Sequence, residues 1–256
     1  MIYRKNPLEQ VICQLRFPTI LAISSNPPAA FQERLRDQYP LFTTLPQLPS
    51  ANKIPREILK HLIPGSVNSL LGPPCYQMSS QDMNWVLQLN QDYISLTTRA
   101  YTRWEDFQHR VLTLIDALVV EYRPAFFDRI GLRYQDVIRR EVLHLQESEW
   151  STLLKPFVAG ILNERAIAGS VRQLSTQALV SLDHYRAQVR ISHGLAEDSK
   201  TRLPCYMIDS DFSTEEKIDV TDSIHVLQYF NRYAGRLFRW CISDTLHDAM
   251  DPQPTE

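Results

Sequence analysis

Two arginines with a glycine between them are the first residues of the sequence that could bind a ligand. Arg129 and Arg133 lie in the segment Phe126–Tyr134, where apolar and polar residues alternate as in a strand with one buried face. The alternation puts both guanidinium groups on the opposite face, and Gly131 would allow a ligand to approach closely. Two such groups can clamp a phosphate or a carboxylate. The alternative is that each arginine pairs with an acidic residue of a neighbouring strand or helix.

Two aspartates, Asp209 and Asp211, stand at alternate positions of a later predicted strand. Carboxylates at this spacing can hold Mg²⁺ in sites that transfer phosphoryl groups. The sequence has no glycine-rich loop of the kind that cradles phosphate in such sites. The two aspartates are therefore weak candidates for a metal site, and pairing with arginines explains them better. The candidate partners are Arg186 and Arg190, or Arg129 and Arg133 if the two halves of the chain meet.

Three arginines recur on one side of the last predicted helix. Arg232, Arg236 and Arg239 are spaced by four and three residues, with Tyr233 and Trp240 beside them. A strip of positive charge with aromatic residues is typical of surfaces that bind nucleic acid. The alternative is a solvated helix face whose arginines cover the adjoining apolar surface. A formal net charge of −2 gives no general attraction to nucleic acid, so that function ranks second.

Motifs of established enzyme classes are missing from the sequence. The seven histidines lack the spacings of zinc hydrolases, and the four cysteines are scattered without metal-ligand spacing. No nucleophile elbow, phosphate-binding loop or dinucleotide fingerprint occurs. We therefore expect no catalytic residues, no cofactor and no metal, with a metal-dependent phosphoryl-transfer enzyme as the third hypothesis. The cysteines are expected to be buried, reduced thiols.

The composition is that of a folded, water-soluble protein. Hydrophobic residues make up 44% of the chain and charged residues 22%, which argues against disorder. No apolar run reaches the length of about 18 residues that spans a membrane, and residues 1–6 lack the apolar segment of a signal peptide. We expect a cytoplasmic protein without membrane contact, whose partner is another protein or a second copy of the chain.

A long amphipathic helix organises the first half of the chain. Apolar residues recur at intervals of three and four from Trp104 to Tyr122, and Pro124 ends the pattern. Thr102 and Glu105 have the spacing of a capping box at its start. The helix must cover a sheet, for which residues 8–17, 85–89, 93–98 and 129–138 are the predicted strands. Its expected core residues are Trp104, Phe107, Val111, Leu114 and Leu118.

The second half repeats the order of strands followed by a long helix. Residues 171–179, 181–192 and 203–212 read as strands, and a helix should run from about 219–222 to 247. The prediction is an α+β fold of two loosely similar units, each an antiparallel or mixed sheet packed by one long helix. The units are residues 1–145, with a proline-rich excursion at 40–74 and a helical turn near 56–61, and residues 146–256. The expected core residues of the second helix are Leu227, Phe230, Ala234, Phe238 and Cys241.

Four sequence blocks point to a known group of proteins: PLEQVICQLRF at 7–17, YTRWEDF at 101–107, RIGLRY at 129–134 and IDSDF at 208–212. Together they resemble a sporadically distributed, functionally uncharacterised family of prokaryotic proteins of about this length. The family usually has a glutamate where Asp128 stands and an Ile-Asn pair near Gln135 and Asp136. The resemblance implies no activity and no catalytic residues. A patchy distribution would suit an accessory gene of a mobile or defence-associated system.

These observations favour a non-catalytic accessory or interaction protein. Its expected ligand- or partner-binding residues are Arg129, Gly131, Arg133, Arg232, Arg236 and Arg239. The alternative is a module that binds nucleic acid or a nucleotide through an arginine-lined face. If Arg129 and Arg133 bind the partner, replacing both with alanine abolishes function and leaves folding cooperative. A large loss of stability with binding unchanged would make them structural.

Overall fold

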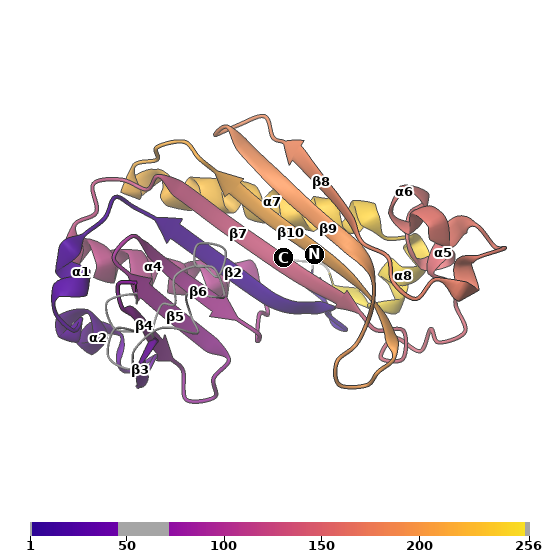
Figure 1. Cartoon of the computed structure of the whole chain (residues 1–256), viewed down its shortest axis with the longest axis horizontal. Coiled ribbons are helices and arrows are strands. Elements are labelled where there is room, and N and C mark those ends of the chain that lie inside the picture. The colour runs from indigo at the N-terminus through magenta and orange to yellow at the C-terminus, as the bar shows by residue number, and fades with distance from the viewer. Residues whose placement is uncertain (1, 46–71, 254–256) are drawn as a thin grey trace, which may run out of the picture.

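The computed structural model describes residues 2–45 and 72–253, and within them the chain forms a broad sheet with two long helices on one face (Figure 1). The sheet strands are β2 (Leu8–Arg16), β3 (Leu41–Leu45), β4 (Cys75–Ser79), β5 (Trp85–Asn90), β6 (Tyr93–Thr98), β7 (Arg129–Ile138), β8 (Thr176–Ser181), β9 (Ala187–Glu197) and β10 (Pro204–Thr214). A separate two-stranded pairing joins β1 (Ile2–Tyr3) to β11 (Pro252–Gln253). The helices are α1 (Leu21–Ser25), α2 (Ala29–Leu35), α4 (Trp104–Tyr122), α5 (Trp150–Leu153), α6 (Pro156–Ala159), α7 (Ser223–Cys241) and α8 (Asp244–Ala249), with 3₁₀ turns at Gly160–Asn163, Ala168–Ser170 and Val220–Asp222.

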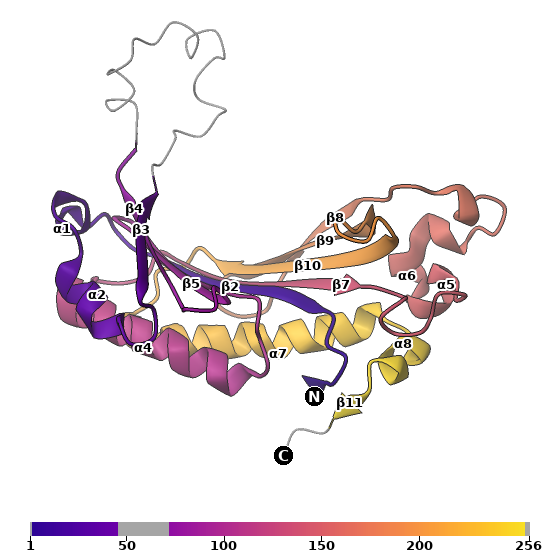
Figure 2. The same ribbon diagram turned by 90° about the horizontal axis from the view of Figure 1, so that it is seen from below.

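The nine strands of the described residues lie in the order β3-β4-β5-β6-β2-β7-β10-β9-β8, and every neighbouring pair is antiparallel. The predicted α+β class is confirmed. β7 pairs with β10 from Ile138 opposite Tyr206 to Ile130 opposite Thr214. Strands from both sides of residue 145, the predicted boundary between units, therefore belong to one continuous sheet. Figure 2 shows α4 and α7 side by side beneath it.

Alternation along each strand separates an apolar face, covered by α4 and α7, from an opposite face that we call the polar face. On β7, Ile130, Leu132 and Tyr134 are buried towards the helices, whereas Arg129 and Arg133 point the other way and are only partly buried. The helices contribute the predicted core residues with the exception of Trp104. Buried on them are Phe107, Val111, Leu114 and Leu118 of α4 and Leu227, Phe230, Ala234, Phe238 and Cys241 of α7, while Trp104 is half-buried.

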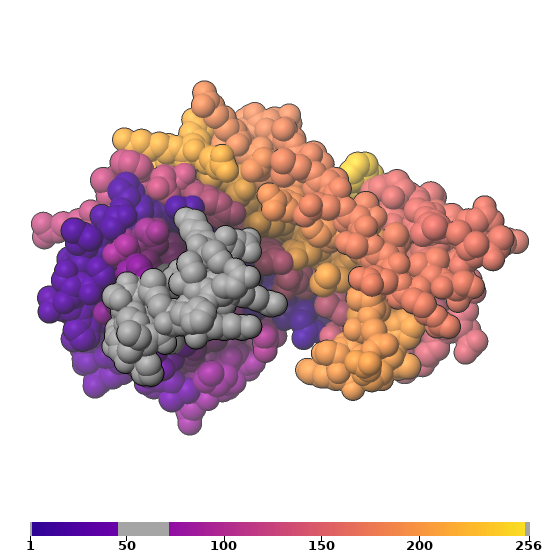
Figure 3. All heavy atoms as spheres, in the orientation of Figure 1, coloured from indigo at the N-terminus to yellow at the C-terminus, as the bar shows by residue number. Residues whose placement is uncertain are grey.

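One row of residues that runs across the polar face is polar on every strand except β7, where Gly131 stands. In this row, Gln77 of β4 accepts a hydrogen bond from Gln88 of β5, with a distance of 3.2 Å between the amide groups. The register aligns one such residue from each strand: Thr43, Gln77, Gln88, Ser95, Gln14, Gly131, Ser213, Gln188 and Ser181. Figure 3 looks onto this face, where the loop between β9 and β10 stands apart from the first half of the chain and leaves a notch over the start of β2.

Two predictions about the start of α4 and the proline-rich excursion are wrong. The N-cap of α4 is Arg103, without a side-chain cap, because the Thr102 hydroxyl donates instead to the Asp106 carboxylate at 3.2 Å. Residues 41–45, within the predicted irregular excursion, form β3, because pairing with β4 stabilises the strand directly after Pro40. The helical turn predicted at 56–61 lies outside the described residues.

The predicted boundaries in the second half also shift. The last helix ends at Cys241, and α8 starts separately because the Ser243 hydroxyl accepts the Leu246 amide at 3.2 Å and caps it. The strand expected at 171–179 begins only at Thr176. The strand expected from 181 begins at Ala187, because Tyr185 and Arg186 have φ angles of 60° and 44° that turn the chain into a hairpin.

The four cysteines are free and buried, as predicted. Burial raises the pKa of Cys13 and of Cys241 to about 12, so both stay protonated and unreactive at neutral pH. Among the described helices, none is long and apolar enough to cross a membrane.

Replacing Val111 with aspartate should unfold a large share of the protein. Val111 is 1% exposed between α4 and the sheet, so the new carboxylate would be buried without a partner. The expected loss is about 3–5 kcal/mol of unfolding free energy, measured by urea denaturation. Asp116→Ala, on the exposed side of the same helix, is the matched control. A stable Val111→Asp variant would contradict the packing of α4.

Candidate functional site

The first predicted arginine pair is placed on the polar face, where β7 lies beside β10. Arg133 forms a bidentate ion pair with Asp209: Nε donates to Oδ1 at 2.7 Å and Nη2 donates to Oδ2. Gln135 donates a further hydrogen bond to Oδ2 at 3.1 Å. The hydrogen bond to Asp209 raises the pKa of Arg133. Asp209, 7% exposed, therefore has its hydrogen-bonding capacity largely filled.

Arg129 is held by a looser set of contacts two residues earlier on β7. Its Nη2 lies 3.9 Å from a carboxylate oxygen of Asp211, and its Nη1 donates to the Gln14 side chain at 3.1 Å. The guanidinium lies across Gly131, where a Cβ atom would stand 2.7 Å from Nη1. Gly131 therefore makes room for Arg129 itself, and any larger residue would displace that side chain.

The register of β7 and β10 thus brings all four predicted charged residues together. Asp209 and Asp211 pair with Arg129 and Arg133 of the first half, and Asp211 also faces Arg190 across β9. Burial raises the pKa of Asp211. No group of three or more possible metal-ligating residues occurs within residues 2–45 and 72–253. Internal pairing, the alternative explanation for these arginines, is the one that the geometry favours.

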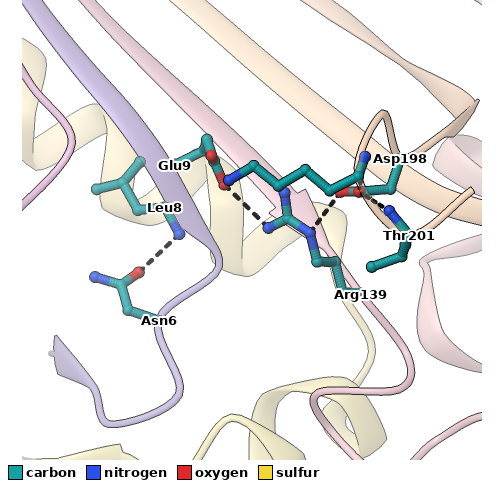
Figure 4. A network of polar contacts seen from close by, with 7 residues as sticks. Asn6, Leu8, Glu9, Arg139, Asp198 and Thr201 are labelled. Atoms are coloured by element: carbon teal, nitrogen blue, oxygen red, sulfur yellow. Dashed lines mark hydrogen bonds and ion pairs between the residues drawn. The ribbon is translucent and has the colours of Figure 1, made fainter.

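A second polar network ties the start of β2 to the end of β7 and the loop between β9 and β10 (Figure 4). Arg139 donates from Nε to Asp198 at 2.8 Å and from Nη1 to Glu9 at 3.0 Å. The other oxygen of Asp198 accepts the backbone amides of Lys200 and Thr201. These amides and Arg139 hold the pKa of Asp198 well below its usual range. The network is internally satisfied, so it fixes strand ends rather than leaving a group for a ligand.

The second predicted set, on α7, lines a hollow of about 980 Å³ on the opposite side of the sheet, which we call the α7 groove. It opens between α7, the start of α4 and the N-terminal strand β1, which lie on the same side of the sheet in Figure 2. Its volume is in the range of small-molecule and peptide-anchor sites. The cationic residues that line it are Arg103, Lys155, Arg232, Arg236 and Arg239.

The cations of the α7 groove differ in how they are paired. Arg103 pairs with Asp106 at 3.1 Å, and Arg239 pairs with Asp244 while donating to the Ile242 carbonyl at 3.3 Å. Arg232 and Arg236 form no ion pair with any described residue, although the Arg236 guanidinium lies 5.9 Å from the centre of the Tyr233 ring. These two exposed arginines are therefore available to an anion from outside the chain.

The floor of the α7 groove is polar and deeply buried. Tyr134 of β7 donates its hydroxyl proton to the Asn231 side chain of α7 at 2.9 Å. Asp136 and Ser210, on the helix-covered faces of β7 and β10, are 7% and 4% exposed. Within the described residues, the Asp136 carboxyl makes no hydrogen bond or ion pair. Its pKa is raised to about 8, first by burial and then by the carboxylate of Asp209 on the other face of the sheet.

Asp136 was not predicted as a site residue. The alternation in the sequence places Asp136 on the face of the strand opposite Arg129 and Arg133, and the structure has it on that face. The sequence did contain a sign of this site. Asp136 stands at an even-numbered position, as do Ile130, Leu132 and Tyr134, so it should point to the same apolar face, and a charged residue at a core position is unusual. What the sequence could not indicate was the hollow in front of it, which depends on where α7 and β1 pack.

No protein-family model and no curated protein matches the chain. Among solved structures, one described as "KH domains" aligns with 97% of this chain and 88% of its own length, at 12% sequence identity. Its TM-score is 0.24, which is too low to establish a shared fold.

Replacing Arg133 with alanine should weaken the fold. The change leaves Asp209 buried without its charged partner, at a cost of about 1–3 kcal/mol of unfolding free energy. Arg190→Ala is the control, because Arg190 is exposed and lies on the other side of Asp211 from Arg133. It should change stability by less than about 0.5 kcal/mol. Urea denaturation of both variants measures the difference. Equal stability of the two would show that the Arg133–Asp209 pair is not structural.

The buried Asp136 should make stability depend on pH. Its folded pKa of about 8 lies above the unfolded value of about 4, so the folded state holds the proton more tightly. This contribution is fully present below pH 4 and is lost as pH rises towards 8, by up to about 1.4 kcal/mol per pH unit. Asp136→Asn cannot ionise and should gain stability over the wild type between pH 5 and pH 8.

Thermal unfolding at several pH values tests this effect. Asp116→Asn, at an exposed position of α4, should follow the wild-type profile. If Asp136→Asn also follows that profile, the carboxyl is not titrating between these pH values.

Proposed function

We propose that this protein is a non-catalytic accessory protein that binds an anionic segment of a partner protein in the α7 groove. The observation that carries the proposal is that Arg232 and Arg236 are exposed and, within the described part of the chain, unpaired. They are exposed, line a hollow together with three further cations, and have no ion pair among the described residues. Carboxylates of an extended acidic segment would neutralise them with charge-assisted hydrogen bonds.

The contrast with the polar face supports this choice of surface. Arg133 is held by two bonds to Asp209, and Arg129 lies against Asp211 and Gln14, so a ligand there would have to displace existing partners. An anion that binds Arg232 or Arg236 in the α7 groove would not have to displace an existing ion pair with a described residue. We therefore propose that Arg129 and Arg133 on the polar face are structural.

Single-stranded nucleic acid is the second candidate for the anionic partner. Two tryptophans favour it: Trp104 and Trp240 both line the α7 groove, and Trp240 is 64% exposed. Bases can stack on exposed tryptophan while arginines contact the phosphates. The net charge of −2 favours the protein partner, because it gives the chain no general attraction to the phosphates of a nucleic acid.

Replacing both Arg232 and Arg236 with glutamine should abolish binding of acidic ligands. An acetylated hexaglutamate peptide and a ten-nucleotide oligothymidylate serve as the two probes, measured by calorimetry at low and moderate salt. The double variant should lose at least about tenfold in affinity for the probe that binds, because two charge-assisted contacts are removed. Affinity for the wild type should fall as salt rises.

Arg165→Gln is the matched control, since Arg165 is exposed outside the α7 groove. It should bind like the wild type. Tighter binding of the oligothymidylate than of the peptide would favour the nucleic-acid candidate. Undiminished binding of both probes to the double variant would place the binding surface elsewhere.

A further inference from the structure

The Asp136 carboxyl is a group that the fold itself does not explain. It is 7% exposed, lines the α7 groove, and has no hydrogen-bond or ion-pair partner among the described residues. Burying a carboxyl without a partner opposes folding, whereas an apolar side chain at this position would extend the row of Ile130, Leu132 and Tyr134. A ligand that pairs with Asp136 would supply the missing interaction.

Aromatic side chains line the same groove as this carboxyl. Tyr3, Tyr101, Trp104 and Phe238 all line the α7 groove together with Asp136. Tyr3 is held in place by an edge-to-face contact with Phe238 and by a 2.8 Å hydrogen bond between its hydroxyl and Nδ1 of His247. Tyr101 packs edge-on against Tyr134. Aromatic rings in the same groove as a buried carboxyl can stabilise an organic cation.

The mouth of the α7 groove imposes a second condition. Arg232 and Arg236 stand there without acidic partners, so a ligand with positive charge alone would be repelled on entry. A ligand that carries a negative charge beside the positive one would satisfy both ends. The groove therefore offers a buried carboxyl to a positive charge and two exposed guanidinium groups to a negative charge on one ligand.

We propose that the α7 groove binds a zwitterionic group, with an ammonium or guanidinium at Asp136 and a carboxylate or phosphate at Arg232 and Arg236. This inference rests on the proposed function and names the chemistry of the ligand. Two sources share it: a lysine or arginine flanked by acidic residues in a partner segment, and a small molecule such as phosphoethanolamine. In the first case, the basic side chain enters the groove and the flanking carboxylates stay at the mouth.

Proton release distinguishes this pairing from a structural role for Asp136. Because its pKa is about 8, a bound cation must stabilise the ionised form, and below pH 8 the proton leaves on binding. The charged groups that share the groove are Arg103, Glu105, Lys155, Arg232, Arg236 and Arg239. Burial raises the pKa values of Tyr3, Tyr101, Tyr134 and Cys241, so these groups keep their protons at pH 7.

Calorimetry on the full chain tests the proposal with matched probes. The capped peptide Glu-Glu-Lys-Glu-Glu should bind at least tenfold more tightly than the same peptide with glutamine in place of lysine. Phosphoethanolamine should bind more tightly than either ethanolamine or inorganic phosphate, and whichever zwitterion binds better identifies the source. At pH 7, binding should release a proton, seen as a heat that changes with the ionisation enthalpy of the buffer.

Asp136→Asn should lose at least tenfold in affinity for the zwitterionic probes and should release no proton. Asp116→Asn, an exposed change on α4, should behave like the wild type. If Asp136→Asn binds both peptides like the wild type while Arg232→Gln does not, the groove binds anions only: this inference fails and the proposed function stands. If no probe binds the wild type, both fail. Binding of oligothymidylate alone, independent of Asp136, also overturns the inference.

Discussion

The hydrogen-bond ladder between β7 and β10 is the interaction on which the rest of the structure depends. It joins strands from the two halves of the chain along nine residue pairs, from Ile138 opposite Tyr206 to Ile130 opposite Thr214. Without it, each half would end in an unpaired strand whose backbone groups need partners. The ladder also brings α7, from the second half, into contact with β7 of the first half. Both the core and the candidate site are therefore shared between the halves.

The same ladder explains why two similar-looking arginine sets have different surroundings. Its register places Asp209 and Asp211 beside Arg129 and Arg133, so the charges on the polar face are balanced within the sheet. Arg232 and Arg236 project from α7 into the groove, and neither forms an ion pair with a described residue. Whether an arginine is structural or available for binding thus follows from the element opposite it, not from its own spacing.

Much of the secondary structure could be predicted because periodicity is a local property. The apolar faces of the helices at 104–122 and 223–241 and the alternation in β7 follow directly from residue spacing. Errors occurred where pairing or capping between distant residues decides the outcome. β3 forms because β4 lies beside it, and the last helix stops at Cys241 because Ser243 caps a new one.

The candidate site could be predicted only in part, for the same physical reason. The arginine strip of α7 is visible in the sequence. The alternation along β7, which places Asp136 and Arg129 on opposite faces, is visible as well. The groove is not visible, because its walls come from residues as far apart as Tyr3, Tyr101 and Phe238. The pairing of Asp209 with Arg133 joins residues 76 positions apart, and it could be named only as one alternative.

The position of β2 in the sheet has a consequence for the order in which the protein assembles. β2 is synthesised well before its two neighbours, β6 and β7, which begin at Tyr93 and Arg129. A ribosome adding about 5–20 residues per second would leave β2 without either neighbour for several seconds. Pairings across such distances in sequence also fold slowly in isolation, in about milliseconds to seconds. During that interval an apolar strand is exposed, and a chaperone that shields it would raise the yield of native protein.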